Sequence, residues 1–289
     1  MNFFILSSDK NKNFFIISII SIFLIYFITF IFLNYINSKG PSEVYLAKYQ
    51  LEKIKDKDYS TVFLGDSTLG TSINTDYWNE LSKEETLNLA MWGNVSFEGH
   101  LYLLNKLNLN KIKKIYIMTG LDIWINDPQI SIKQVKLLDN YLNKKSFIFP
   151  SIQTIKHYFR GNPRIVNDYV ENNQYLTIDD IRKISIKNLI PDNVQFSHVE
   201  NLKKIFQICE ENNIKCFHLN GPIHFKFCND TNIKLYMDTI YNLFNKTKIF
   251  YSKNVPCIRQ FELGNFWTHP HPNYKNKFTK EYFILAQNG

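Results

Sequence analysis

The chain has 289 residues and a mass of 34.3 kDa, and 45% of its residues are hydrophobic. This size and composition suit one sizeable α/β domain with an appendage, and they exclude a largely disordered chain. The net charge of +8 indicates an anionic partner, such as a membrane face or an acidic glycan. Nucleic acid is disfavoured as a partner, because the lysines are spread along the chain and no nucleic-acid-binding motif is present.

The first distinctive segment is an uncharged apolar run from Phe14 to Leu33. A helix needs about 20 apolar residues to cross a bilayer. A cleaved signal peptide is the alternative, but its apolar core is usually about 7–15 residues and no small-residue cleavage site follows this run. We therefore expect residues 1–37 to be a cytoplasmic tail and an uncleaved transmembrane anchor. Lys10 and Lys12 favour a cytoplasmic N-terminus, with the remaining chain periplasmic or extracellular.

Residues 38–58 are expected to join the anchor to the main domain, as a breaker-rich linker followed by an amphipathic helix over Val44–Ile54. From residue 59 onward, short apolar runs alternate with segments of helical length. The expected strands are Thr61–Leu64, Thr86–Ala90, Ile112–Met118, Ile214–Leu219, and either Ile249–Tyr251 or Val255–Ile258. This alternation predicts that residues 59–289 form a flavodoxin-like three-layer α/β/α sandwich with a central parallel sheet. In such sheets ligands bind at the carboxyl ends of the strands.

A long stretch, residues 123–197, separates the third and fourth expected strands. Its helical candidates are Ser131–Asn143, Ser151–Phe159 and Thr177–Leu189. It also contains basic residues among aromatic ones, namely Lys144, Lys145, Lys156, Arg160 and Arg164. We interpret the stretch either as a solvated helical insertion or as a cap or membrane-facing lid over an acceptor site.

Two short motifs contain the parts of a serine nucleophile. Gly65-Asp66-Ser67 directly follows the first strand, and His271-Pro272-Asn273 lies near the other end of the chain. Ser67 would attack, His271 would act as general base, and the backbone N–H groups of Ser67 and Gly93 would stabilise an oxyanion. The structural alternatives are a helix cap for Ser67 and a surface loop histidine for His271.

The motifs resemble those of the SGNH (GDSL-like) hydrolase and acyltransferase superfamily. Val62–Ser67 is similar to its first block and Asn88–Gly93 to its second. Gly120–Asp122 stands at the third block, and His271–Asn273 resembles the end of the last block. The resemblance implies the flavodoxin-like sandwich of SGNH type, and it covers residue 59 to the C-terminus without the long insertion.

Two positions depart from the family pattern. Thr268 stands where the family has the aspartate that orients the histidine, and Asp122 stands where it has an oxyanion-hole asparagine. An ionised Asp122 would oppose an oxyanion. Three arrangements stay open: Asp122 or Glu262 orients His271, a backbone carbonyl holds His271 in a dyad, or His269 is the base. The other residues expected near the site are Asp66, Asn88, Thr268, His269 and Asn273.

Together with the anchor, the resemblance implies a membrane-anchored serine acyltransferase similar to DltD-like and alginate-acetylation-like envelope proteins. Such a protein passes an acetyl, alanyl or other acyl group through an acyl-serine at Ser67. The resemblance further implies a membrane-borne donor, supplied by a membrane acyltransferase partner, and an anionic cell-envelope glycan or polymer as acceptor. No cofactor is required. An esterase or lipase of the same fold and a non-catalytic envelope assembly protein are the alternatives.

All four cysteines lie in the last third of the chain, and their spacing does not indicate zinc. We therefore expect no metal site. Cys228 and Cys257 are candidates for a disulfide between two loops. The alternative is four separate buried thiols, at Cys209, Cys216, Cys228 and Cys257.

Overall fold

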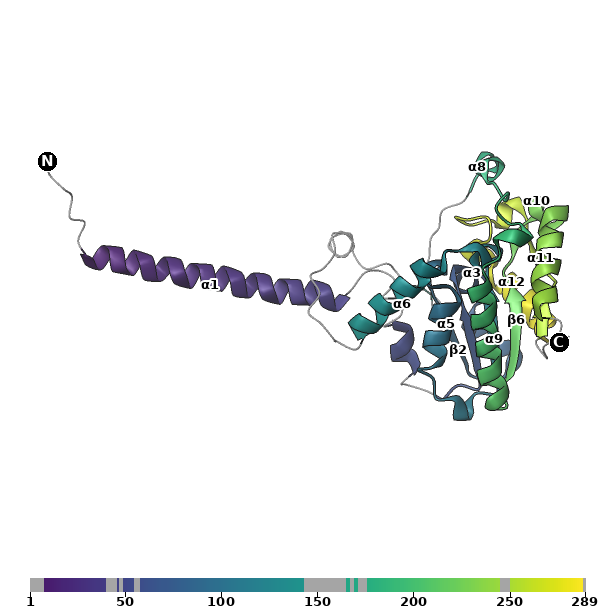
Figure 1. Cartoon of the computed structure of the whole chain (residues 1–289), viewed down its shortest axis with the longest axis horizontal. Helices are drawn as coiled ribbons and strands as arrows, with labels where there is room; N and C mark the ends of the chain where they lie inside the picture. Colours follow the sequence, from purple (N-terminus) through teal and green to yellow (C-terminus); the bar gives the residue numbers. More distant parts are fainter. Residues whose placement is uncertain are drawn as a thin grey trace.

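The computed structural model describes residues 8–39, 46, 49–54, 58–142, 165–166, 169–170, 176–244 and 250–287. Its first element is α1 (Ser8–Lys39), which contains the apolar run Phe14–Leu33 with a mean hydropathy of 2.8. In Figure 1, α1 extends away from the α/β part of the chain, and none of the apolar run is buried. An exposed apolar surface of this length suits a membrane anchor or a signal sequence.

Five parallel strands form the central sheet. Their order across the sheet is β2 (Thr86–Ala90), β1 (Thr61–Gly65), β3 (Lys114–Thr119), β6 (Lys215–Asn220) and β8 (Phe250–Ser252). All residues of β1 and β2 are buried, as expected for strands covered on both faces. Read in chain order, the strand order is 2-1-3-4-5, which is the flavodoxin-like arrangement predicted from the sequence.

Helices cover both faces of this sheet. On one face α5 (Ser96–Leu104) packs against α9 (Phe196–Glu211) and α6 (Pro128–Leu142), and α5 and α9 lie in front of the sheet in Figure 1. On the other face α12 (Lys275–Gln287) packs against α3 (Ser67–Ser72) and α4 (Thr75–Ser82). The remaining helices are α8 (Ile178–Lys183), α10 (Phe225–Cys228) and α11 (Thr231–Phe244).

Aromatic rings on neighbouring strands stabilise the face under α4 and α12. Phe63, Tyr116 and Phe217 are adjacent in register on β1, β3 and β6. Their ring centroids are 5.0 and 5.1 Å apart in stacked pairs, and Trp78 packs edge-on against Phe63 at 4.8 Å. Such cross-strand pairs fix the register of the sheet as well as burying apolar area, so the ends of the strands are held level.

The edge strand β2 is covered by the segment that follows the anchor. Gln50 is fully buried, and its Nε2 donates to the Ala90 carbonyl at 2.9 Å. Lys53 Nζ donates to the Asn88 carbonyl at 3.0 Å. Because an open strand edge invites pairing with other chains, these side chains protect β2 and tie residues 49–54 to the domain.

The long stretch between β3 and β6 contains short elements. α6 matches the helix expected over Ser131–Asn143, whereas α8 is much shorter than the expected Thr177–Leu189. Helix α8 ends at Lys183 because Ile184, Ile186 and Leu189 pack onto the core in a non-helical path. Two strands, β4 (Ile165–Val166) and β5 (Tyr169–Val170), form an antiparallel pair that the sequence did not predict. The expected helix Ser151–Phe159 and the basic residues 144, 145, 156, 160 and 164 lie outside the described residues.

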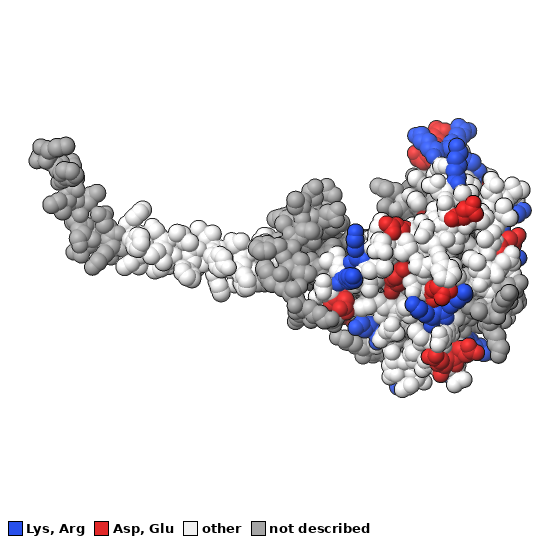
Figure 2. Space-filling view, in the orientation of Figure 1, with Lys and Arg blue, Asp and Glu red and all other residues white. Residues whose placement is uncertain are grey.

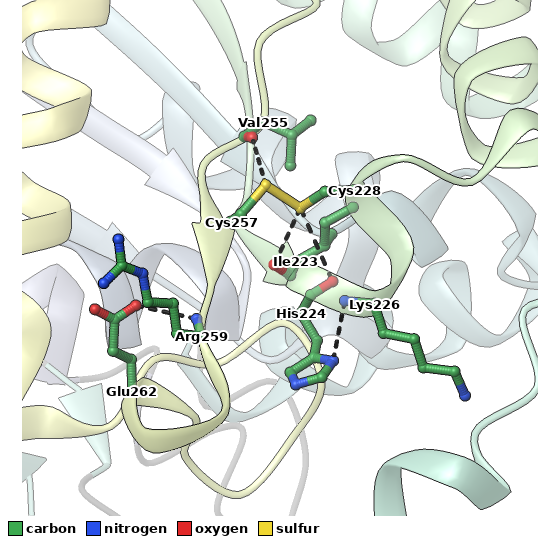
Figure 3. The surroundings of a disulfide bond; sticks show 8 residues. All are labelled: Ile223, His224, Lys226, Cys228, Val255, Cys257, Arg259 and Glu262. Atoms are coloured by element: carbon green, nitrogen blue, oxygen red, sulfur yellow. Dashed lines mark hydrogen bonds between the residues drawn. A yellow bond between two sulfur atoms is a disulfide. The ribbon is translucent and has the colours of Figure 1, made fainter. Parts of the chain in front are cut away.

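Two disulfides tie the C-terminal half together. Cys228 is bonded to Cys257, as one of the two sequence interpretations proposed (Figure 3), and Cys209 is bonded to Cys216. The first bond lies beside a small parallel pair, β7 (Ile223–His224) with β9 (Cys257–Ile258). Disulfides persist in oxidising compartments. With the N-terminal apolar helix, they indicate that the α/β domain is extracytoplasmic.

Buried histidines make the fold sensitive to acid. Burial lowers the pKa of His100 to about 4 and that of His218 to about 3. The unfolded chain takes up protons near pH 6.5 and the folded chain does not, so stability is lost as pH falls from 6.5 toward 4, by about 3 kcal/mol per histidine. Asp66 acts in the opposite direction, because burial raises its pKa to about 6 and its contribution is lost as pH rises.

We therefore expect the free energy of unfolding to fall between pH 6.5 and 4, because His100 and His218 together exceed the contribution of Asp66. Denaturant titrations at several pH values measure this slope. His100→Asn should flatten the slope even if it lowers stability at neutral pH. An unchanged slope in the variant would show that His100 is not the proton acceptor.

Candidate active site at the carboxyl edge of the sheet

A close approach of β1 to β3 positions the turn that holds Ser67. A Cβ added at Gly65 would lie 2.1 Å from the Met118 carbonyl oxygen, so only glycine fits there. The next residue, Asp66, is the N-cap of α3, and its Oδ1 accepts from the Thr68 N–H at 2.8 Å and from the Thr68 hydroxyl at 2.5 Å. Ser67 is therefore the first residue of α3, directly beyond the sheet edge.

The second oxygen of Asp66 links this turn to the neighbouring strand. Asp66 Oδ2 accepts from the Gly120 N–H, just after β3, at 2.8 Å. Burial raises the pKa of Asp66 to about 6 and the nearby Asp122 carboxyl adds to the rise, whereas the bonds from Thr68 and Gly120 oppose it. These bonds are all to groups of the turn and of the neighbouring strand end, so Asp66 holds the ends of β1 and β3 together.

The Ser67 hydroxyl contacts a histidine 202 residues away in the sequence. Ser67 Oγ and His269 Nε2 are 2.9 Å apart, and His269 Nδ1 lies 3.0 Å from Asn265 Oδ1. With the amide oxygen of Asn265 as acceptor, Nδ1 carries the proton and Nε2 is free to accept the serine proton. Burial lowers the pKa of His269 to about 4, so its imidazole is neutral at physiological pH. Serine, neutral base and orienting group are thus aligned.

The expectation that His271 faces Ser67 is wrong. Within the described residues, His269 is the only side chain hydrogen-bonded to the Ser67 hydroxyl. His271 is buried instead beside the turn Pro272–Tyr274, where its Nδ1 accepts from the Asn273 N–H at 3.2 Å. Its role there is to cap that turn, and the predicted neighbour Asn273 takes part in the same cap.

A tight reversal of the chain presents His269 to the serine. Leu263 and Pro270 form an antiparallel bridge, and the Gly264 N–H donates to the His269 carbonyl at 2.8 Å. The reversal is also attached to β7, because the His224 N–H donates to the Trp267 carbonyl at 2.8 Å. His271 lies two residues further along the chain, and its side chain lies against the turn Pro272–Tyr274. The two histidines therefore have different surroundings.

The orienting group is Asn265, a residue that the sequence analysis missed. Neither predicted carboxylate takes this place. Glu262 Oε2 accepts from the Arg259 N–H at 3.0 Å (Figure 3), and its Oε1 forms an ion pair with Lys277 Nζ at 2.7 Å. Thr268 is buried, but it does not line the pocket beside Ser67. Asn265 lies four residues before His269, within reach across the reversal, and this spacing was the available signal.

A pocket of about 410 Å³ opens beside the pair. Its lining residues come from the ends of several elements and are Ser67, Trp92, Gly93, Asn94, Asp122, Asn126, Asp127, Ile130, Ser131, Phe266 and His269. A site at the carboxyl ends of the strands is the position expected for a parallel sheet. Asn88, by contrast, is buried within β2, where its Oδ1 accepts from the Ala90 N–H, so it supports the strand and does not line the pocket.

Backbone donors are available next to the serine. In the described part of the chain, the N–H groups of Ser67 and Gly93 make no hydrogen bond, and both residues line the pocket. A Cβ added at Gly93 would meet only Asp66 Cβ, at 4.0 Å, so the space above this glycine is open. Asn126 helps to hold the Gly93 backbone in place, because its Nδ2 donates to the Gly93 carbonyl at 3.3 Å. Asn126 was not predicted from the sequence.

Asp122 is the acidic member of the pocket. Burial raises its pKa, which favours the neutral carboxylic acid. A neutral acid can donate a hydrogen bond, whereas a carboxylate only accepts. Among the described residues, no group of three or more His, Cys, Asp or Glu side chains is arranged to hold a metal ion.

Comparisons with models of protein families and with curated protein sequences find no match. The class that the fold defines is therefore an α/β protein with a parallel flavodoxin-like sheet and one N-terminal apolar helix.

The pKa of His269 is directly measurable. We expect NMR titration of its ring to give a value near 4, because burial disfavours the imidazolium and Asn265 has no charge to stabilise it. Asn265→Asp should raise this pKa, since an ionised carboxylate favours the charged ring. Asn265→Leu is the control that removes the bond without adding charge. A value near 6.5 in the unaltered protein would contradict the burial of the ring.

Proposed function

We propose that this protein is a membrane-anchored serine acyltransferase that forms an acyl-enzyme at Ser67. The observation that carries the proposal is the 2.9 Å contact between Ser67 Oγ and His269 Nε2, with Asn265 behind the ring. The geometry matches the requirement for an activated serine: a nucleophile, a base within hydrogen-bond reach, and a third group that orients the base.

The residues support a two-step reaction. Ser67 Oγ attacks the carbonyl carbon of the donor ester or thioester while His269 takes the hydroxyl proton. The N–H groups of Ser67 and Gly93 stabilise the tetrahedral oxyanion, and the leaving group departs with the proton from His269. In the second step an acceptor hydroxyl gives its proton to His269 and attacks the acyl carbon. Ser67 is released with its own proton restored.

The family assignment belongs to the same proposal. The Gly-Asp-Ser turn after β1, Gly93 after β2 and a histidine close to the C-terminus follow the order of the SGNH superfamily. The base here is His269, which displaces the family pattern by two residues, and an amide replaces the family's aspartate. Asn265 can fix the ring tautomer, but it does not stabilise the imidazolium by charge.

The anchor suggests where the reaction takes place. Helix α1 would hold the domain at the outer face of a bilayer, with the N-terminus cytoplasmic and the domain periplasmic or extracellular. We propose that the donor is membrane-borne and delivered by a membrane acyltransferase, and that the acceptor is a cell-envelope glycan or polymer. The net charge of +8 favours an envelope of anionic character.

A membrane-anchored esterase is the second candidate, because the same residues would pass the acyl group to water. The exposed rim of the pocket, where Asp127 is exposed and Ile130 is 49% exposed, favours access of water. The aligned Ser67 and His269 argue against the third alternative, an assembly protein without catalysis.

The first test is covalent labelling by a fluorophosphonate probe. The full-length protein in detergent should be labelled, and Ser67→Ala should remove the label while Ser185→Ala, an exposed serine, should not. His269→Ala should slow labelling by about 10²–10⁴-fold, because the general base is lost.

His271→Ala is the matched control for the histidine. It should lower the melting temperature, because His271 is buried, but it should leave the labelling rate of the folded protein within a few-fold. Absence of labelling in well-folded protein would remove both enzyme candidates.

Asp122 predicts an unusual pH dependence. The neutral acid is compatible with an adjacent oxyanion, whereas the carboxylate opposes it. Activity should therefore decline as pH rises through the raised pKa of Asp122. Asp122→Asn should keep activity and remove the decline, which rate measurements from pH 5 to 9 on a small ester would detect. A loss of more than 100-fold at every pH in Asp122→Asn would assign a direct role to the carboxylate.

A further inference from the structure

In the described part of the chain, the pocket is lined by two carboxyl side chains and by no basic side chain other than His269. Asp122 and Asp127 belong to the lining, and no Lys or Arg does so in the described part of the chain. Basic side chains lie elsewhere: Figure 2 shows blue side chains beside red ones over α8, whose first turn contains Asp179 and Asp180 and whose last turn contains Arg182 and Lys183. Among the described residues, the basic side chains that give the chain its positive net charge therefore do not line the space next to Ser67.

The pocket also contains polar groups that lack a partner. Ser131 is fully buried, and its Oγ has no hydrogen bond among the described residues. Asn94 Oδ1 is also buried, and it has no hydrogen bond to any described residue. Buried polar atoms are nearly always paired, so these two positions indicate contacts that a ligand supplies. Asn94 accepts and the Ser131 hydroxyl both donates and accepts, which suits ligand hydroxyl groups.

Apolar surface accompanies these polar groups. Trp92, Ile130 and Phe266 line the same space, and Phe266 is 39% exposed with its ring 5.3 Å from that of His269. Flat aromatic faces beside acceptor atoms suit a ring that has C–H groups on its faces and hydroxyls at its edge. A sugar ring combines both features.

We infer that the pocket takes an uncharged sugar ring and excludes anionic groups. The claim that this ring is the acyl acceptor rests on the proposed reaction at Ser67. The claim that the pocket binds the ring does not depend on that reaction. The acyl group is then transferred to a hydroxyl of a neutral unit. An acidic unit with a uronate or phosphate next to the accepting hydroxyl would bring its negative charge against Asp127 at the rim.

Binding can be measured without turnover in full-length Ser67→Ala protein in detergent. The probes are methyl glucoside and chitotriose as neutral ligands, and methyl glucuronide and trigalacturonate as anionic ones, all followed by saturation-transfer NMR and calorimetry. We expect the neutral probes to bind at least tenfold more tightly than the anionic ones. Asp127→Asn should reduce this ratio, and Asp192→Asn, at an exposed carboxylate outside the pocket, should not.

Ser131→Ala supplies an independent measurement. This substitution should weaken binding of the neutral probes about tenfold without lowering the melting temperature, because the Ser131 hydroxyl has no hydrogen-bond partner among the described residues. The inference is overturned if the anionic probes bind as well as the neutral ones, or if no neutral probe binds. Fluorophosphonate labelling of Ser67 in the unaltered protein reports the reaction separately, so labelling with no neutral-sugar binding would reject this inference alone.

Discussion

The carboxylate of Asp66 determines the position of Ser67. One of its oxygens caps α3 through Thr68 and the other accepts from Gly120 beyond β3, so a single buried side chain joins the ends of two strands to the start of a helix. Ser67 is the next residue and has little freedom to move. Burial raises the pKa of this carboxyl to about 6, whereas the bonds from Thr68 and Gly120 favour its ionised form. The position of Ser67 is therefore linked to the protonation of Asp66.

The parallel sheet converts this local constraint into a complete site. Aromatic pairs between β1, β3 and β6 keep the strand ends level, so the turns that carry Ser67, Gly93 and Asp122 meet at one edge. The histidine arrives separately, on a chain reversal attached to β7, and β7 lies beside the Cys228–Cys257 bond. The residues at the strand ends are held in place by the packing of the sheet. The position of His269 depends instead on the chain reversal, on β7 and on the nearby disulfide.

The sequence predicted the parts that follow from local chemistry. Apolar runs of strand length gave the five strands, and the Gly-Asp-Ser turn located Ser67, because short-range patterns specify both. The choice between His269 and His271 could not be made in this way. It depends on the path of a reversal fixed by a bridge from Leu263 to Pro270, and a shift of two residues changes which side chain reaches the serine. Asn265 escaped prediction for the same reason, since an orienting carboxylate was sought and the chain uses an amide.

The use of Asn265 in place of an aspartate is consistent with the other charges in the site. A buried ring with a pKa near 4 stays neutral without a carboxylate beside it, and it is ready to accept a proton over the whole physiological range. An ionised carboxylate in place of Asn265 would add repulsion near Asp66 and Asp122, two carboxyls whose pKa burial already raises. An amide orients the imidazole without this cost. The site thus limits its negative charge, which favours the oxyanion that the proposed reaction must form.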